Sequence, residues 1–359
     1  MLINHAEMDV LRLAAWCKDL PQNTPQCLHA DTWNMLLRMG YLQSNRSGIC
    51  HRPAAKALDL LQSAGYDYPQ DTRKLSGGSA LTRRLELTEL VLFLYSMGAD
   101  VFLEGPTQQR PTISFLPSFT FRRAKGSNVL GGTRLTGFLY APQITFIPYY
   151  ISSGREGIYP HIEQMTFSME HLNDHQTPAV IYIGKPDLPD LLRNVIHAAE
   201  VKFKSGAVTY QQAMGMFTAP VCFVPLSADG ARQLRIMCQP DYRKEITRVF
   251  LKKNGCAPSE FTWCDAIDNK TGDPFLVGVD MNLKGFDRAL GFAKGKMLRI
   301  AVLDFQYESA ASYLKDKEVS LSAMPLGNVE KLLSLSGLPG PDITPYQTKE
   351  GGYINVSAI

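Results

Sequence analysis

The stretch from Leu11 to Gly65 constrains the fold of this chain more than any other, because three runs with helical spacing surround one short polar turn. The second run, ADTWNMLLRMGYL, shows this spacing most clearly. Its apolar residues Trp33, Leu36 and Leu37 fall three and four positions apart, so they share one face of a helix. The run therefore predicts a short amphipathic helix that packs one face on a core.

The ends of this predicted helix carry the signals that helix ends require. Asp31 can accept a backbone N–H at the start, and Gly40 can end the helix in the left-handed conformation. Between them, Asn34 and Arg38 lie away from the apolar face. The sequence thus predicts a helix over residues 31–39 that presents an amide and a guanidinium group to its surroundings.

A turn with basic flanks, QSNRSGICHR, follows this helix. Tyr41 and Leu42 are expected to begin a strand, residues 44–48 to turn it and Ile49 to begin the return, which puts Arg46 near the tip of a hairpin. The third run, PAAKALDLLQSAG, has helical spacing again. The order helix, helix, hairpin, helix is typical of a winged helix-turn-helix. The alternative is a small helical hairpin whose polar face simply meets water.

Charge is distributed unevenly along the chain. The 359 residues are 45% hydrophobic and 20% charged, which is ordinary for a soluble globular protein, and the formal net charge is only +3. Residues 38–84, however, hold eight Arg or Lys against three Asp, a net charge of +5. One window therefore carries more positive charge than the whole chain, as a surface that contacts nucleic acid would.

These features predict that double-stranded DNA is the partner of the N-terminal region. In a winged helix-turn-helix, the helix over residues 31–39 would enter the major groove and its polar side chains would face base edges. Basic side chains on and after the hairpin would contact phosphates. The predicted DNA-binding residues are Asn34, Arg38, Arg46, Arg52, Lys56, Arg83 and Arg84.

The cysteines and the apolar runs indicate the cellular compartment in which the protein is expected. Seven cysteines occur, an odd number, and none forms a Cys-x-x-Cys pair, so reduced thiols are predicted rather than a disulfide framework or a zinc knuckle. His5, Glu7 and Asp9 interrupt the N-terminal apolar residues, which does not match a signal peptide. No apolar run approaches the roughly 20 residues that span a bilayer. We therefore expect a cytoplasmic protein without a membrane partner.

The first domain is expected to span residues 1–100 and to be mainly helical. One helix is predicted over residues 6–19, and another with Pro53 in its first turn that ends at Gly65. A long apolar helix is predicted over residues 80–97, which packs on the winged-helix core or, alternatively, pairs two copies in a homodimer. Residues 101–131 are expected to be a connector.

Beyond the connector, in residues 132–337, apolar strands alternate with helical runs. This alternation predicts an α/β domain with a mixed sheet. No internal repeat is visible in the sequence, and residues 338–359, which are rich in proline, are expected to form an extended tail. Strands are predicted at residues 133–140, 144–151, 179–184, 221–226, 275–281 and 298–305, and helices at residues 162–172, 188–199 and from about residue 229.

Three strings in the first domain, LLRMGYLQSNRSG, KALDLLQSAG and LTRRLELTELVLFLYSMG, resemble the winged-helix region and the following helix of the replication-relaxation proteins of plasmids and integrative conjugative elements. The segment RLTGFLYAPQITFIPYYI, with the Glu163-bearing segment after it, is similar to uncharacterised proteins of mobile elements. The resemblance implies DNA binding in plasmid replication or conjugative transfer.

The same resemblance implies a second domain with a fold like that of the PD-(D/E)xK nucleases. That fold needs carboxylates on a β-hairpin, where Asp and Glu hold a divalent metal and a Lys positions the water. The candidate hairpin here offers Arg134, Thr136, Thr145 and Tyr149, and no acid. We therefore expect a degenerate nuclease-like domain that has no catalytic activity and no cofactor.

One other string mimics the nuclease signature, Pro186-Asp187 followed by Glu200-Val201-Lys202. These residue types suit phosphodiester hydrolysis assisted by Mg²⁺. The residues between them have helical spacing, however, and on a helix Glu200 and Lys202 would lie about 200° apart. The preferred interpretation is that Asp187, Glu200 and Lys202 do not form a catalytic site.

Two further groups carry residue types suited to metals. Asp280 and Asp304 each close an apolar run typical of a buried strand, and α/β proteins hold ligands and metals at the carboxyl ends of neighbouring strands. The preferred interpretation is nevertheless that Asp280 and Asp304 cap helices or lie in loops and bind no metal. His171 and His175 are four apart and can share a helix face that binds zinc, but a solvated helix end is preferred. No metal site is therefore expected.

Three functions stay open at this level. We favour an accessory or regulatory factor of a mobile element that binds double-stranded DNA and is not an enzyme. The second is a Mg²⁺-dependent DNA nuclease that uses the carboxylates above. The third is a protein-interaction scaffold in which the helix over residues 80–97 pairs two copies. No phosphate-binding loop or nucleophile elbow indicates another enzyme class.

Overall fold

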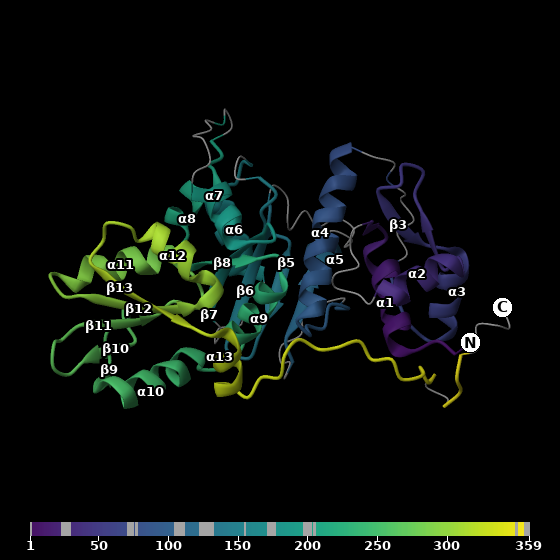
Figure 1. The fold of residues 1–359 in the computed structure, drawn as a ribbon. Coiled ribbons are helices and arrows are strands. Elements are labelled where there is room, and N and C mark those ends of the chain that lie inside the picture. Colours follow the sequence, from purple (N-terminus) through teal and green to yellow (C-terminus); the bar gives the residue numbers. More distant parts are fainter. Residues whose placement is uncertain are drawn as a thin grey trace. The chain divides into compact units, whose positions relative to one another are not determined.

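Helix α1 (His5–Cys17) opens the first of the two units into which the chain divides, residues 1–96 with 339–359 and residues 97–338 (Figure 1). Asn4 Oδ1 accepts the Glu7 N–H at 2.8 Å, and Glu7 Oε2 accepts the Asn4 N–H at 2.9 Å. This capping box satisfies backbone donors at the start of α1. The computed structural model describes residues 2–22, 30–69, 75, 78–103, 112–121, 133–153, 156–170, 177–196, 203, 206–348 and 351–354.

A hairpin between two helices forms the centre of the first unit, as predicted. Helix α2 (Ala30–Arg38) precedes strands β2 (Leu42–Ser44) and β3 (Cys50–Pro53), and helix α3 (Ala55–Ser63) follows them. Strand β1 (Leu20–Pro21) completes an antiparallel sheet with the order β1-β3-β2. The sequence did not indicate β1, and the segment preceding α2, residues 23–29, lies outside the described residues.

Pro53 is not in the first turn of a helix, so that prediction was wrong. It ends β3, where it lies opposite Leu42. A proline is tolerated at the end of a strand because no ladder bond needs its missing N–H. Helix α3 begins two residues later, after Ala54, whose backbone is extended.

The predicted long apolar helix is α4 (Gly78–Ser96), and within the first unit it contacts β1 and α1. The Tyr95 hydroxyl donates to Asp9 Oδ2 of α1 at 2.6 Å. The tail also belongs to this unit, as an extended segment that forms hydrogen bonds with the residues before α1 and at its start. The Tyr346 N–H donates to Ile3 O at 2.8 Å, and the His5 N–H donates to Thr344 O at 3.0 Å.

The second unit begins with a strand inside the predicted connector. Strand β4 (Ser114–Pro117) is fully buried and pairs with β5 (Gly137–Tyr140), and α5 (Ser118–Phe121) follows it, so residues 101–131 are not only a connector. The strand is short and lacks the alternation that marks strands in a sequence. The basic residues Arg122, Arg123 and Lys125 lie outside the described residues.

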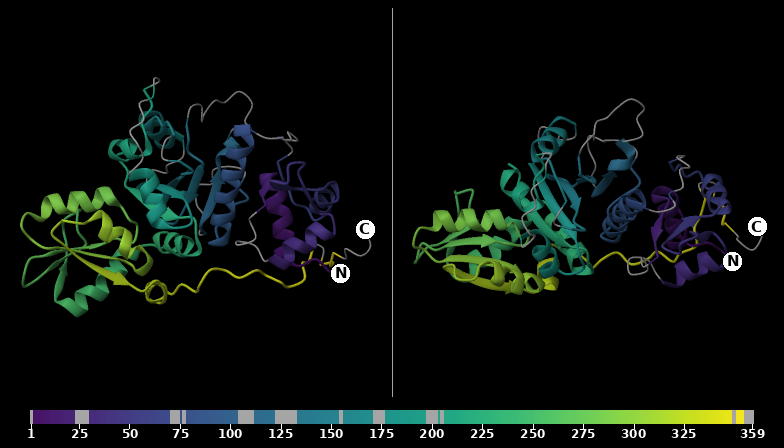
Figure 2. Two further views of the ribbon diagram at one scale, coloured as in Figure 1. Left: turned by 45° about the horizontal axis from the view of Figure 1, so that its top comes forward. Right: turned by 90° about the horizontal axis from the view of Figure 1, so that it is seen from above.

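Two five-stranded sheets share one plan, which the sequence did not reveal as a repeat. Each has three antiparallel strands followed by two parallel ones, and Figure 2 shows one sheet in blue to teal and the other in green to yellow. The first has the order β4-β5-β6-β7-β8, with β6 (Ile144–Tyr150), β7 (Thr177–Gly184) and β8 (Val221–Pro225). The second has the order β13-β12-β11-β10-β9, with β9 (Cys256–Pro258), β10 (Ala266–Asp268), β11 (Pro274–Val277), β12 (Leu298–Leu303) and β13 (Val319–Met324).

Helices lie between these strands and after the last one, in keeping with the predicted alternation of strands and helices. They are α6 (Pro160–Glu170), α7 (Leu188–Ile196), α8 (Tyr210–Met216), α9 (Ala228–Met237), α10 (Tyr242–Asn254), α11 (Leu283–Ala293), α12 (Tyr307–Tyr313) after a 3₁₀ turn, and α13 (Leu326–Leu332). The fold is therefore mixed α/β, which confirms the predicted class. In the described part of the chain, no helix is both long and apolar enough to cross a bilayer.

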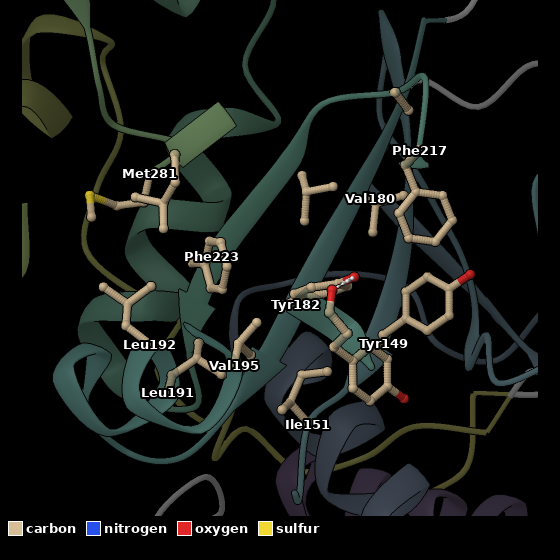
Figure 3. Packing of buried hydrophobic residues seen from close by; sticks show 14 of the residues in the cluster. Tyr149, Ile151, Val180, Tyr182, Leu191, Leu192, Val195, Phe217, Phe223 and Met281 are labelled. Carbon is tan, nitrogen blue, oxygen red and sulfur yellow. Dashed lines mark hydrogen bonds between the residues drawn. The ribbon is translucent and has the colours of Figure 1, made fainter. Parts of the chain in front are cut away.

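The buried side chains of the two sheets form one hydrophobic cluster. Figure 3 shows Tyr149, Val180 and Tyr182 of the first sheet with Phe223 and with Met281, which precedes α11. The strands that supply these residues are apolar almost throughout, as parallel strands covered on both faces are. The two sheets therefore belong to a single core rather than to two separate ones.

Candidate nucleic-acid interface

Helix α2 turns one face into its unit and the other to solvent. Trp33 and Leu36 are buried, and the Trp33 ring meets the His51 ring edge-on at 5.2 Å between centroids. Asn34 and Arg38 are exposed on the opposite side, as predicted. The prediction that Asp31 caps this helix was wrong, because α2 already includes Ala30 and Asp31 therefore lies inside the helix.

The end of α2 is held by a cation. Gly40 has a φ of +67°, which lets the chain leave the helix in the left-handed conformation, as predicted. The Lys56 ammonium donates to the Met39 carbonyl and lies 4.4 Å from the centroid of the Tyr41 ring. A cation at this position opposes the partial negative charge of the helix end. Lys56, predicted to contact phosphate, is thus half-buried and stabilises α2.

Asn45 shapes the turn between β2 and β3. Its Oδ1 accepts the N–H of Ile49 at 2.9 Å and that of Cys50 at 3.3 Å, which closes the turn from inside. Arg46 then lies at the tip of the hairpin with its side chain exposed, as predicted. The hairpin therefore presents one guanidinium group beyond the end of α2.

Arg52 and Arg84 have a role that the sequence did not indicate. Both bind Asp19, whose side chain is 1% exposed: Arg52 Nε lies 2.5 Å from Oδ1, and Arg84 Nη1 lies 2.8 Å from Oδ2. The Cys50 thiol donates to the same carboxylate, and burial together with Asp19 raises the pKa of Cys50 to about 11. A carboxylate buried this deeply needs such partners, because an unpaired charge is costly inside a protein. Both guanidinium groups are therefore engaged within the unit.

The seven predicted DNA-binding residues thus separate into two groups. Asn34, Arg38 and Arg46 are exposed on α2 and the hairpin, and Arg83 is exposed on α4. Arg52, Lys56 and Arg84 make contacts that hold the unit together. Only the first group presents its polar atoms to a partner without giving up an interior contact.

The predicted nuclease-like string is only partly described. Asp187 is exposed, and its Oδ1 accepts the Asp190 N–H at 2.8 Å, so it caps the start of α7. Glu200 and Lys202 lie outside the described residues. The contact that Asp187 makes is the one expected of a helix-capping aspartate.

Asp280 and Asp304 do follow neighbouring strands, since β11 and β12 pair in parallel. The side chains of Asp280 and Asp304 nevertheless differ in exposure and in their partners. Asp304 is exposed and accepts the Phe305 N–H, whereas Asp280 is 7% exposed and its Oδ2 lies 2.9 Å from Arg243 Nη1. Burial raises the pKa of Asp280, and the Arg243 charge opposes this rise. Asp280 therefore belongs to an ion-pair cluster.

Histidines and metal-ligand groups give no site in the described part of the chain. His171 and His175 lie outside the described residues, and His161 is exposed. Among the residues that the structure describes, no three His, Cys, Asp or Glu side chains come together as a metal site.

Glu163 on α6 is a buried acid whose surroundings the sequence did not reveal. Its Oε1 accepts the Arg134 N–H at 2.6 Å and its Oε2 accepts the Tyr149 O–H at 2.9 Å. Burial raises the pKa of Glu163 to about 7, although these hydrogen bonds act to lower it. Near neutral pH this carboxyl group therefore exists in both protonation states.

The geometry above defines a mixed α/β protein whose first unit exposes Asn34 and Arg38 on a helix and Arg46 on the adjacent hairpin. Comparison with protein-family models, with curated proteins and with solved structures gave no match to this chain.

Proposed function

We propose that the first unit binds double-stranded DNA through α2 and the β2–β3 hairpin. The observation that supports this most directly is the exposure of Asn34 and Arg38 on one face of α2, beside a hairpin that carries Arg46 at its tip. An amide and a guanidinium on a short helix suit base edges in the major groove. An arginine on a wing suits the phosphate backbone, whose oxygens its guanidinium group can bind in pairs.

The order of elements supports the same proposal. The sheet order β1-β3-β2, with α2 directly before β2, puts a helix and a hairpin next to each other, which supports assigning α2 as the recognition helix and the hairpin as the wing. The resemblance to replication-relaxation proteins supports a role in plasmid replication or conjugative transfer. We infer a binding factor rather than a nuclease, because the β5–β6 hairpin carries no carboxylate to hold a metal.

The test is a salt titration with a labelled random-sequence duplex, followed by fluorescence anisotropy. If Arg46 and Arg83 each neutralise one phosphate, affinity should fall roughly 12-fold between about 50 and 200 mM salt. Arg46→Ala removes one of these contacts, so the same change of salt should lower the affinity of this variant only roughly 3- to 4-fold. Asn34→Ala should instead alter which duplexes are preferred in a competition experiment and leave the salt dependence unchanged.

Arg248→Ala is the matched control, since Arg248 on α10 of the second unit is 63% exposed and its loss changes net charge equally. It should leave both the affinity and the salt dependence as they are. Affinity that hardly depends on salt, or Arg46→Ala behaving like Arg248→Ala, would overturn the proposal.

A further inference from the structure

A cavity of about 330 Å³ lies in the second unit, and residues from both sheets line it. Phe146 of β6, Leu276 of β11 and Met237 of α9 give it apolar walls. Sites for small ligands are typically concave and largely apolar, with a few polar groups that fix orientation. The volume of this cavity lies at the lower end of the range found for such sites.

The polar wall of the cavity is built around Arg243. Its Nε and Nη2 bind the two oxygens of Asp265 at 3.1 and 3.0 Å, and its Nη1 binds Asp280 at 2.9 Å. Each carboxylate oxygen can accept more than one hydrogen bond. Asp280 and Asn282, which also line the cavity, therefore offer an acceptor and an amide to a bound molecule. Because the two aspartates share one arginine, this wall favours hydrogen-bond donors over anions.

Three aromatic rings lead from the cavity to the surface. Trp263 lines the cavity and stacks with Phe261 at 5.6 Å and with Phe292 at 5.8 Å, both at 23° between planes. Phe261 and Phe292 are 55% and 50% exposed. Arg288 also lines the cavity and lies 5.9 Å above the Phe292 ring. Half-exposed parallel rings next to a cation form a platform on which a planar ligand can stack.

We propose that this cavity binds a nucleobase. The base stacks on the platform formed by the rings of Trp263, Phe261 and Phe292 and directs its N–H donors to Asp280. A flat base can stack on the aromatic rings, and the N–H groups at its edge can donate to the Asp280 carboxylate. Arg288 at the platform suits the phosphate that a nucleotide carries on its sugar. The base can belong to a free nucleotide or to a single strand of nucleic acid. The proposal does not depend on duplex binding by the first unit.

Tryptophan fluorescence of the full chain provides the test. The chain has three tryptophans, and Trp16 and Trp33 are buried in the first unit, so stacking on Trp263 should give a separate, saturable quenching. The probes are adenosine and guanosine 5′-monophosphate, with ribose 5-phosphate as the control that lacks a base. We expect quenching and a calorimetric binding signal with the nucleotides and neither with ribose 5-phosphate.

Calorimetry on variants tests whether the nucleotide binds at this cavity. Trp263→Ala should weaken nucleotide binding by roughly 5- to 150-fold, the range measured for removing one base-stacking aromatic side chain. Phe261→Ala and Phe292→Ala, at exposed positions that the core does not need, should weaken it several-fold without unfolding the chain. Tyr353→Ala, which removes an aromatic ring 55% exposed in the first unit, should have no effect.

Comparison with a short oligo(dA) strand separates the two sources of the base. Equal affinity for the strand and the mononucleotide supports a free nucleotide as ligand, and tighter binding of the strand supports single-stranded nucleic acid. The proposal is overturned if no nucleotide or strand binds at millimolar concentration, if ribose 5-phosphate binds equally well, or if none of the three aromatic substitutions weakens binding.

Discussion

Two buried carboxylates, Asp19 and Glu163, are accommodated in opposite ways. Asp19 lies between the guanidinium groups of Arg52 and Arg84, so its negative charge is compensated directly. Glu163 accepts hydrogen bonds from a backbone N–H and a phenol, which stabilise the charged form less than two cations do. Burial therefore dominates at Glu163 and raises its pKa, which makes the protonated form important to the fold.

We expect the free energy of unfolding to depend on pH through Glu163. The pKa of this group rises from 4.5 to about 7 on folding, so between these values the folded state binds more protons than the unfolded state. Stability should therefore fall as the pH rises through this window, by at most about 1.4 kcal/mol for each pH unit.

Glu163→Gln removes this titration and keeps a similar side-chain shape. Denaturant unfolding of both proteins between pH 4.5 and 8 should show the wild type losing stability relative to Glu163→Gln up to about pH 7, with a constant difference above it. Parallel curves across the whole range would show that Glu163 does not titrate in this way.

At the scale of elements, the pairing of β4 with β5 depends on one glycine. Gly137 begins β5 with a φ of +153°, and a Cβ at this position would lie 2.3 Å from the backbone oxygen of Leu116 in β4. The backbone of a paired strand cannot move away without breaking the ladder. A side chain at residue 137 is therefore incompatible with the edge of the first sheet.

Gly137→Ala should destabilise the second unit by at least about 1 kcal/mol, because it combines an unfavourable φ with a backbone clash. Gly291→Ala is the matched change: Gly291 lies in α11 with nothing within 4 Å of its Cβ position, so alanine should stabilise the helix by roughly 0.5–1 kcal/mol. The denaturant midpoints of the two variants should move in opposite directions, and a shift in the same direction would contradict this reasoning.

At the scale of the whole molecule, segments far apart in the chain complete the first unit. Residues of the tail form a bridge with Asn4 through Pro345, and the Tyr346 ring lies 5.0 Å from His5 and 6.0 Å from Tyr66. Tyr346 is only 6% exposed. The tail therefore contributes to the core of the unit that begins the chain.

Tyr346→Ala should destabilise the first unit by about 3 kcal/mol, as the loss of a buried aromatic ring does. Variants that keep only Trp33 or only Trp263 allow the unfolding of each unit to be followed by fluorescence. We expect the unfolding transition reported by Trp33 to move to a lower denaturant concentration and the transition reported by Trp263 to remain unchanged. Tyr353→Ala, at an exposed position, should change neither transition.

Local patterns allowed several elements to be predicted. The apolar spacing of α2, the turn residues before β3 and the apolar runs of β6, β7, β8 and β12 each lie within a few neighbouring residues, and each element was found. The exposure of Asn34, Arg38 and Arg46 also follows from position on one helix or one turn. Such features depend on short-range geometry that the order of residues specifies directly.

Other features depend on partners distant in the chain. Strand β1 has two residues and exists because β3 pairs with it, and β4 is a strand because β5 covers its edge. The division into two sheets with one plan has no counterpart in the sequence pattern, since strands such as β9 and β10 have only three residues. Pairing across a sheet supplies the hydrogen bonds that such short segments cannot make alone.

The sequence by itself determined the mixed α/β class, the helix and hairpin of the first unit and the side chains that they expose, because period and turn chemistry act locally. Only the tertiary structure decided which charged groups face inward. Arg52 and Arg84 converge on Asp19, and Arg243 joins Asp265 to Asp280, across separations of 22 to 65 residues. A charge is neutralised by whatever lies beside it in space, and that neighbour is set by the packing of the whole chain.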